Sequence, residues 1–380
     1  MTDLKSSFPS DSDALAAFHD ELARVPNPAL WLRFAGYYQG LARLPRRLRR
    51  TLQRRSLGGI ALLCALGQAP ALAATINVGG ACTLIDAITA ANDNRPVGGC
   101  TVGSGADTIV LPPNSIHTLT AVNNTADGSP NGLPPITSTI TIAGNGSTIS
   151  RDPAAPDFRI LLVRNNGGDL TLRETTVSGG RTIQFRAGGG VANDGVLSLV
   201  NSNVINNYSP DGGGGLHNNF GATLHLTNST VSGNLAAFDG GGIRNRGNLT
   251  VTNSTVSGNS ATQDGGGVIS GGTLTLLNST VSANTASQFG GGLRISFGTA
   301  IVTNSTVSGN FARRNGGGLN NTGTVTFTTS TVSGNSTGEN GGGVRNSGTV
   351  TLNETLISGN TASSQGRELT HPRQSRGLIG

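Results

Sequence analysis

The chain has 380 residues, with 58 Gly, 4% aromatic residues and 12% charged residues, where an average soluble domain has about 25% charged residues. So few large apolar side chains exclude a conventional globular core, which needs them to offset the chain entropy lost on folding. The formal net charge is +6, but residues 1–73 hold ten Lys/Arg and five Asp/Glu and carry most of it. The remainder is nearly neutral, so no nucleic-acid partner is expected.

The N-terminal segment has the pattern of a secretory signal. Residues 1–55 are polar and then basic, and we interpret them as a helical cytoplasmic leader, an extended n-region, with a misplaced start codon as the alternative. The apolar run 56–73 ends in small residues, so we expect cleavage near Ala73 and a secreted or cell-surface protein. Gly67 and Pro70 break this run well short of the roughly 20 residues that a membrane-spanning helix needs. No transmembrane span is therefore expected in the mature chain.

Two cysteines remain after such a cleavage, Cys82 and Cys100. An even number of cysteines in an exported protein indicates a disulfide. Two free or buried thiols are the alternative.

The stretch between the cysteines predicts a short helix. Leu84, Ile85 and Ile88 form one apolar stripe at helical spacing. The helix is expected to start near Thr83 and to end by Asn94, since these residue types favour helix ends.

From residue 107 the pattern changes to short β-branched runs separated by Gly, Pro and Asn. The phrase STVSGN then recurs at intervals of 25 to 27 residues, a period typical of a solenoid. The central residues of its copies are Val177, Val204, Val231, Val256, Val281, Val307, Val332 and Ile357.

The repeats alternate apolar and polar residues and contain no helical period, so strand side chains are expected to point alternately in and out. Three short strands and three turns in about 25 residues predict one coil of a right-handed parallel β-helix, with neighbouring coils about 4.8 Å apart. We therefore predict an all-β fold in which residues 107–362 form the solenoid. The tail 363–380 has no apolar cap, so we expect the last coil to dock on a partner or on a missing segment.

Asparagine recurs in two registers of the repeat. In either register it could turn the chain, because Asn tolerates the left-handed backbone, or its side-chain amide could stack in a ladder along the solenoid. The NST triplets also match a glycosylation acceptor, but four of them in one register favour a role in turns. The first register contains Asn201, Asn228, Asn253, Asn278 and Asn304, and the second contains Asn207, Asn234, Asn259, Asn284, Asn310, Asn335 and Asn360.

The stretch ACTLIDAITAAN at 81–92 resembles the CSLREA domain of exported bacterial proteins. Cys82, Leu84 and Ala87 match its motif, and Ile85 stands where the motif has Arg. Because such domains typically precede β-helices, the resemblance implies an N-terminal cap.

We assign this cap to residues 74–106. The repeats resemble those of pectate-lyase-like β-helices and of polymorphic outer-membrane proteins. The latter pair the motif GGA[IVL] with FxxN, whereas this chain pairs GGG[IVL] with VSGN and so keeps the glycines and the final Asn but lacks the Phe. No C-terminal membrane barrel follows, so self-export through such a barrel is not indicated.

A possible binding row follows the glycine triplets. Arg244, Arg294 and Arg345 recur every second coil, about 9.6 Å apart for a rise of 4.8 Å per coil. Guanidinium groups at this spacing could bind the carboxylates of an acidic polysaccharide. The alternative is a solvated face that carries charge for solubility.

Asp239 and Asp264 precede the glycines in neighbouring coils, where paired carboxylates could attract a cation such as Ca²⁺. The pectate lyases that the repeats resemble use Asp-bound Ca²⁺ with an arginine base. Only Asp239 and Arg244 place both residue types in one coil here, and Ca²⁺ needs six to eight oxygens. Neither a metal site nor a cofactor is therefore expected. His217 has no catalytic partner pattern, and we interpret it as a surface residue.

These observations favour an exported β-helix that acts as a surface adhesion or interaction scaffold, with no catalytic site evident. The alternative is a polysaccharide lyase or glycoside hydrolase that acts on acidic polysaccharide. Enzymes of the families it resembles interrupt the repeat with long loops, whereas the coils here differ by at most two residues in length. Acidic polysaccharide or a cell-surface component is the expected partner. Rows of outward Thr, such as Thr230 and Thr255, could also form an ice-binding face, although Thr is a common strand residue.

Overall fold

The computed structural model describes residues 73–183, 186–364 and 366–370. The chain divides into two compact units, Met1–Pro70 and Ala71–Gly380, and every described residue belongs to the second. The predicted leader and all but the last residue of the predicted signal segment lie outside the described residues. No helix within the described ranges is long and apolar enough to cross a membrane.

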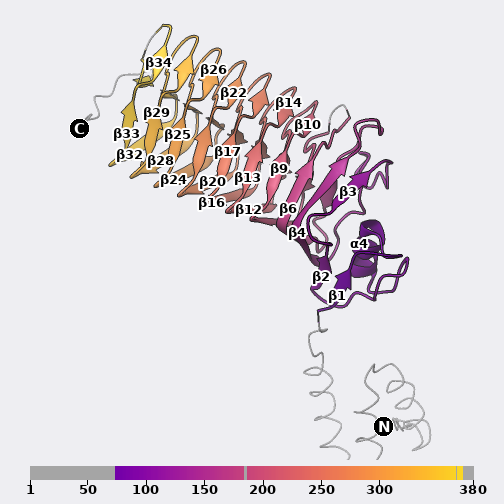
Figure 1. The fold of residues 1–380 in the computed structure, drawn as a ribbon. Coiled ribbons are helices and arrows are strands. Elements are labelled where there is room, and N and C mark those ends of the chain that lie inside the picture. The colour runs from indigo at the N-terminus through magenta and orange to yellow at the C-terminus, as the bar shows by residue number, and fades with distance from the viewer. Residues whose placement is uncertain (1–72, 184–185, 365, 371–380) are drawn as a thin grey trace, which may run out of the picture. The chain divides into compact units, whose positions relative to one another are not determined.

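The second unit is a parallel β-solenoid, which confirms the all-β fold predicted from the repeat (Figure 1). Strands of successive coils lie side by side in three sheets of 19, nine and seven strands. Residues one period apart pair directly, as Val231 with Val256 and Val256 with Val281. The nine strands of the middle-sized sheet mark nine turns of the solenoid.

A short cap and several irregular strands precede the regular coils. They are β1 (Thr75–Asn77), α4 (Leu84–Asp93), β2 (Asp107–Val110), β3 (Ile116–Leu119), β4 (Thr139–Arg151) and β6 (Asp169–Ser178).

Each regular coil has four strands, one more than predicted, because a single left-handed residue divides the longest run in two. In the coil at 243–261 this residue is Asn253, with φ 50°. The five-residue strands on one side of this bend are β8 (Val196–Val200), β12 (Thr223–Thr227), β16 (Asn248–Thr252), β20 (Thr273–Leu277), β24 (Thr299–Thr303), β28 (Thr324–Thr328) and β32 (Thr349–Asn353). The three-residue strands after it are β9 (Asn203–Ile205), β13 (Thr230–Ser232), β17 (Thr255–Ser257), β21 (Thr280–Ser282), β25 (Thr306–Ser308), β29 (Thr331–Ser333) and β33 (Leu356–Ser358).

Two further strands complete each coil. The seven-stranded sheet contains β10 (Tyr208–Ser209), β14 (Leu235–Ala236), β18 (Ser260–Ala261), β22 (Thr285–Ala286), β26 (Phe311–Ala312), β30 (Ser336–Thr337) and β34 (Thr361–Ala362). The nine-stranded sheet contains β5 (Leu161–Val163), β7 (Val191–Asn193), β11 (Leu216–Asn218), β15 (Ile243–Asn245), β19 (Val268–Ser270), β23 (Leu293–Ile295), β27 (Leu319–Asn321), β31 (Val344–Asn346) and β35 (Leu369–Thr370).

The core is a narrow apolar column, as the composition predicts. Leu249, Val251 and Val256 of one coil are all buried, and the same positions in neighbouring coils are buried as well. Thr250 and Thr252 lie between them on the outward side and are half-buried. The alternation of inward and outward residues read from the sequence is therefore confirmed.

The two asparagine registers have different roles. Asn253 and its equivalents are exposed and adopt positive φ at the bend. Asn259 is buried, and its side-chain Oδ1 accepts hydrogen bonds from Nδ2 and the backbone N of Asn234, at 3.0 Å each. Its own Nδ2 donates to Oδ1 of Asn284 at 3.0 Å. Of the two roles predicted for these registers, Asn253 has the turn role and Asn259 the ladder role, while the preceding Gly258 takes the positive φ of 63° at the turn.

A buried serine ladder runs through the first S of each STVSGN phrase. The Ser254 hydroxyl accepts from the backbone N of Ser229 at 3.0 Å and donates to the carbonyl of Thr252 at 2.7 Å. The plain repeated phrase thus supplies both an apolar core and axial hydrogen bonds that satisfy buried backbone groups.

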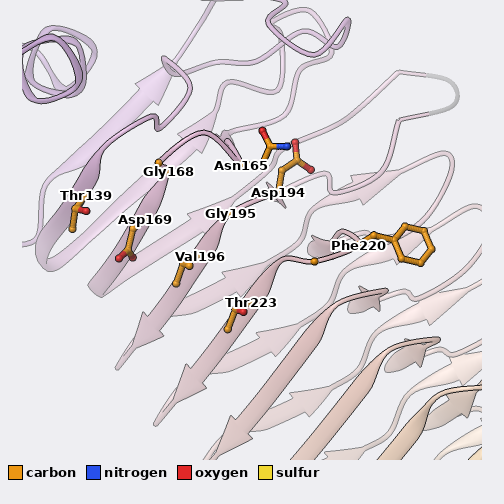
Figure 2. Close-up of a pocket in the computed structure, with 11 residues that line it drawn as sticks. Thr139, Asn165, Gly168, Asp169, Asp194, Gly195, Val196, Phe220 and Thr223 are labelled. Atoms are coloured by element: carbon orange, nitrogen blue, oxygen red, sulfur yellow. The ribbon is translucent and has the colours of Figure 1, made fainter.

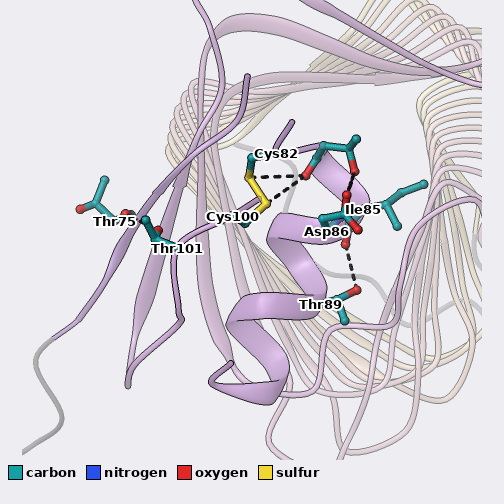
Figure 3. The surroundings of a disulfide bond; sticks show 8 residues. Thr75, Cys82, Ile85, Asp86, Thr89, Cys100 and Thr101 are labelled. Atoms are coloured by element: carbon teal, nitrogen blue, oxygen red, sulfur yellow. Dashed lines mark hydrogen bonds between the residues drawn. A yellow bond between two sulfur atoms is a disulfide. The ribbon is translucent and has the colours of Figure 1, made fainter. Parts of the chain in front are cut away.

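The N-terminal cap is built on α4, which lies beside the disulfide in Figure 3. The predicted start and end of this helix are both confirmed. The Thr83 hydroxyl accepts from the backbone N of Asp86 at 3.1 Å, and Asn94 ends the helix with φ 50°. The predicted disulfide between Cys82 and Cys100 is present. It ties the start of the helix to the strand-rich segment that follows.

The opposite end of the solenoid is closed in part by a charged side chain. Glu368 accepts at Oε2 from Nδ2 of Asn360 at 2.6 Å, in the place that the next asparagine of the ladder would take. Beside it, β35 pairs with β31, within the stretch that the sequence analysis treats as a tail. Leu352 in the last full coil is 39% exposed and Ile357 is half-buried, whereas Phe327 and Val332, the same positions of the preceding coil, are buried.

Candidate functional site

The predicted arginine row lies on the nine-stranded sheet. Its register places His217 beside Arg244 and Arg294 beside Asn320, with Arg345 next in line. The glycines before each strand are required by close packing of the coils: a Cβ on Gly241 would lie 2.3 Å from the carbonyl oxygen of Ser260. Because the glycines recur once per coil, the residue that follows each glycine motif and its apolar residue also recurs once per coil, and these residues form the row.

Arg244 pairs with an aspartate of the preceding coil. Its Nη1 lies 3.0 Å from Oδ2 of Asp211, and its side chain is only 14% exposed. From the sequence, Asp239 of the same coil is the expected carboxylate neighbour of Arg244. Asp211 is followed by four glycines, whereas the neighbouring coils have three. Gly212 therefore pairs with Asp239, and Asp211 lies one residue before the position that the repeat predicts for an aspartate. The missing side chain leaves room for the arginine, since a Cβ on Gly212 would lie 2.8 Å from Cδ of Arg244.

Arg294 repeats this arrangement. Its Nε lies 3.4 Å from Oδ2 of Asp264 in the preceding coil, and its Nη1 donates to Oδ1 of Asn320 at 2.6 Å. The guanidinium also lies 5.9 Å from the ring centre of Phe289. Two of the three arginines in the predicted row are thus neutralised within the protein.

Arg345 differs from the other two arginines. It donates to the carbonyl of Asn346 at 3.0 Å and to Oγ of Ser347 at 3.1 Å, and it forms no salt bridge within the described ranges. The cause is the residue one coil earlier, where Asn315 stands in the register of Asp264. The row therefore offers one arginine without an acidic partner, instead of three.

Asp239 and Asp264 act as backbone acceptors between coils. Oδ1 of Asp239 accepts from the backbone N of Asp264 at 3.2 Å, and Oδ1 of Asp264 accepts from the backbone N of Phe289 at 3.2 Å. Asn315 makes the same bond to Asn340 in a later coil. Burial raises the pKa of both aspartates, although Arg244 and Arg294 counteract it. These carboxylates are therefore members of an axial ladder.

His217 is buried, so its interpretation as a surface residue is wrong. Only 8% of it is exposed, and its Nδ1 has no hydrogen-bond partner among the described residues. Burial, followed by the charges of Arg244, Arg246 and Arg159, lowers the pKa of His217 to about 3. The ring is thus neutral at physiological pH and is a weak base.

A buried ion pair near the first coils has no counterpart in the sequence analysis. Arg159 is 2% exposed and lies 2.8 Å from Oδ2 of Asp127, and it also donates to Oδ1 of Asn131 at 3.0 Å. Burial tends to raise the pKa of Asp127, but the charge and hydrogen bond of Arg159 outweigh burial and lower it. Further bonds to the carbonyls of Ala187 and Gly188 complete the guanidinium's partners. The pair fixes two loops to the solenoid.

A shallow pocket of about 550 Å³ lies away from the arginine row, at the corner where β5, β7 and β11 lead into β6, β8 and β12 (Figure 2). Asp169, Asp194 and Phe220 line it. Phe220 is 74% exposed, and the guanidinium of Arg246 lies 5.3 Å from its ring centre. None of the residues predicted to form a site contributes to this pocket.

The aspartates do not assemble a cation site. Within the described part of the chain no group of three or more His, Cys, Asp or Glu residues is placed to hold a metal ion. Asp239 and Asp264 already accept backbone hydrogen bonds, and Ca²⁺ takes six to eight oxygen ligands. The row is thus arranged for contacts between coils.

Comparison with known proteins gives no relative: no family model, no curated protein and no solved structure matches this chain. The resemblances to CSLREA domains and to pectate-lyase-like repeats rest on their residues alone. Of what those resemblances imply, the parallel β-solenoid and the short helix before it are present.

Proposed function

We propose that this chain is an exported β-helix scaffold that contacts a surface or a polymer through its outer faces and has no catalytic centre. The sequence of residues 56–73 supports export, and the Cys82–Cys100 disulfide is compatible with an oxidising compartment. The solenoid provides long sheets with a residue repeated at every coil, which is the form of surface that extended binding uses.

The observation that carries the proposal is the pairing of Arg244 and Arg294 with Asp211 and Asp264. A catalytic or polyanion-binding row needs charges that are free to meet a substrate. Here the charges satisfy one another across coils, as the Asn and Ser ladders do. The axial rows are therefore accounted for by the stability of the solenoid.

A lyase or hydrolase that acts on acidic polysaccharide is the second candidate. The observation in its favour is that Asp239, Asp264 and His217 all have shifted pKa values, and that the charge of Arg244 acts on both Asp239 and His217. Shifted pKa values are common at active sites. Against it, His217 is buried and neutral, and both aspartates already accept backbone hydrogen bonds between coils.

The two candidates are separated by incubating the purified chain with polygalacturonate and alginate in the presence of Ca²⁺. The scaffold proposal predicts no new ultraviolet absorbance from unsaturated sugar ends and no new reducing ends. Retention of the chain by cell walls or polymer particles, without their breakdown, would support it. Turnover that is abolished by Asp239→Asn would establish the enzyme instead.

A further inference from the structure

The broadest outer surface of the solenoid is the outward side of the five-residue strands β12, β16, β20, β24, β28 and β32, which we name the threonine face. Figure 1 shows these strands side by side along the solenoid. Each strand presents its first, third and fifth residues outward. The threonines of this face are Thr223, Thr227, Thr250, Thr252, Thr273, Thr275, Thr299, Thr303, Thr324, Thr326, Thr328, Thr349 and Thr351.

The threonine face forms a regular lattice. Direct pairing places Thr250 beside Thr275 and Thr252 beside Leu277. The following coils pair in the same register. Neighbouring strands of a sheet lie about 4.8 Å apart, and outward residues within one strand lie about 6.6 Å apart. Hydroxyl and methyl groups therefore repeat in two directions across six coils.

The hydroxyls of the threonine face make no hydrogen bond to other groups in the described part of the chain. Inward polar side chains behave in the opposite way: the Ser254 hydroxyl both accepts and donates, and Asn259 bonds to two neighbouring coils. The inward Ser and Asn ladders thus satisfy their polar groups within the protein, whereas the threonine hydroxyls are available to whatever lies outside.

The threonine face also lacks formal charge. The positions without Thr are taken by His225, Asn248, Leu277, Ile301 and Asn353, so it contains no Asp, Glu, Lys or Arg. Protein surfaces usually have about 25–35% of such residues. An ionic ligand would find no counter-charge here.

Two other partners fit the threonine face poorly. No aromatic side chain points outward from it to stack on a sugar ring. A second copy packed face to face would need an apolar surface, whereas only Leu277 and Ile301 are large and apolar here. What the lattice offers is a repeating set of uncharged hydrogen-bonding groups between methyls.

We infer that the threonine face binds the surface of an ice crystal. Methyl groups restrict the orientation of the water beside them, and the free hydroxyls can donate to and accept from that water. A charged group would bind its own hydration shell and disrupt such a layer. The inference rests on the scaffold role proposed above and names the surface that one face contacts.

The test uses the full chain, and measures ice recrystallisation, the shape of a growing ice crystal and partition of the protein into a slowly grown ice hemisphere. Wild type is expected to inhibit recrystallisation, to facet the crystal and to be taken up by the ice. Thr275→Lys, at the centre of the face, should lose most of each effect. Thr285→Lys is the matched control, since Thr285 is exposed in the same coil but lies on the seven-stranded sheet.

Uptake of wild type and of Thr285→Lys at equal levels, with loss only in Thr275→Lys, would establish the inference. Exclusion of wild type from ice to the same extent as serum albumin would overturn it, as would equal loss in both variants with unchanged circular dichroism. Sedimentation with crystalline chitin or cellulose is measured in parallel. Binding there without binding to ice would reject the ice partner and leave the scaffold proposal standing, whereas failure of every surface tested would count against both.

Discussion

The guanidinium of Arg244 lies 3.0 Å from the carboxylate of Asp211, a residue 33 positions earlier and one coil below it. Arg294 reaches back in the same way over 30 positions to Asp264. In both cases an arginine that looks available in the sequence is already paired. This axial pairing is why the arginine row contributes to the stability of the solenoid and why its capacity to bind polyanions is reduced.

The Asp211–Arg244 pair should show a measurable coupling. Both side chains are partly buried, so in a double-mutant cycle of Asp211→Ala and Arg244→Ala we expect a coupling energy of roughly 0.5–3 kcal/mol. Urea unfolding followed by circular dichroism measures it. The same cycle with Asp239→Ala in place of Asp211→Ala should give a clearly smaller value, and equal values would contradict the pairing described above.

The two asparagine registers should respond differently to mutation. Asn259→Ala leaves the buried backbone N–H of Asn234 without its acceptor and removes the side-chain bond to Asn284, so we expect a loss of roughly 1–3 kcal/mol of the free energy of unfolding. Asn253 has a positive φ, which glycine adopts readily, so Asn253→Gly should lower the free energy of unfolding only slightly. Thermal unfolding of the two variants checks this, and a larger loss for Asn253→Gly would show that the assigned roles are reversed.

His217 should make the protein sensitive to acid. Its pKa in the folded chain is about 3, below the usual value near 6.5, so the unfolded chain binds a proton first as the pH falls. The stabilisation present above pH 6.5 is therefore lost progressively down to about pH 3, by on the order of 3–5 kcal/mol.

Urea midpoints measured across that pH range test the acid sensitivity. His217→Asn, which introduces the residue found at the equivalent position 320, should flatten the profile between pH 6.5 and pH 3. Thr275→Asn, which changes an outward residue that does not titrate, is the control and should leave the slope as in wild type. A wild-type profile that is already flat over this range would contradict the burial of a neutral His217.

The disulfide should hold the N-terminal cap together. Cys82 and Cys100 are 18 residues apart, and closing a loop of this length stabilises the folded state by about 3 kcal/mol. The double variant Cys82→Ser/Cys100→Ser should unfold at correspondingly lower urea. Alkylation of the denatured full chain without reductant should add one label, at Cys64, and three after reduction. Three labels without reductant would mean that the bridge does not form.

The coil itself could be predicted because its determinants are local. Apolar residues alternate with polar ones, glycines stand at the tight corners and the period is constant. These local features bury Leu249, Val251 and Val256 regardless of the sequence of the neighbouring coils. The same holds for α4, whose start at Thr83 and end at Asn94 depend on residues within one or two turns of each end.

The candidate site could be predicted only as a row. Which acid meets Arg244 depends on the extra glycine after Asp211, which shifts that carboxylate by one position relative to the next coil. The lowered pKa of His217 depends on its burial and on charges that come from other coils, among them those of Arg159 and Arg246. Neither effect leaves a periodic signal in the sequence.

The repeated phrase NLTVTNSTVSGN at 248–259 separates what the sequence determines from what depends on the tertiary structure. The sequence by itself determined the period, the parallel solenoid, the inward rows and the pair of cysteines, because each follows from spacing along one chain. Only the tertiary structure decided that Asn253 bends the chain while Asn259 joins the coils, and that Arg244 and Arg294 are paired with aspartates while Arg345 has no such partner among the described residues. The physical reason is that axial contacts join residues about 25–33 positions apart, so they depend on the exact offset between coils and on what each side chain meets there.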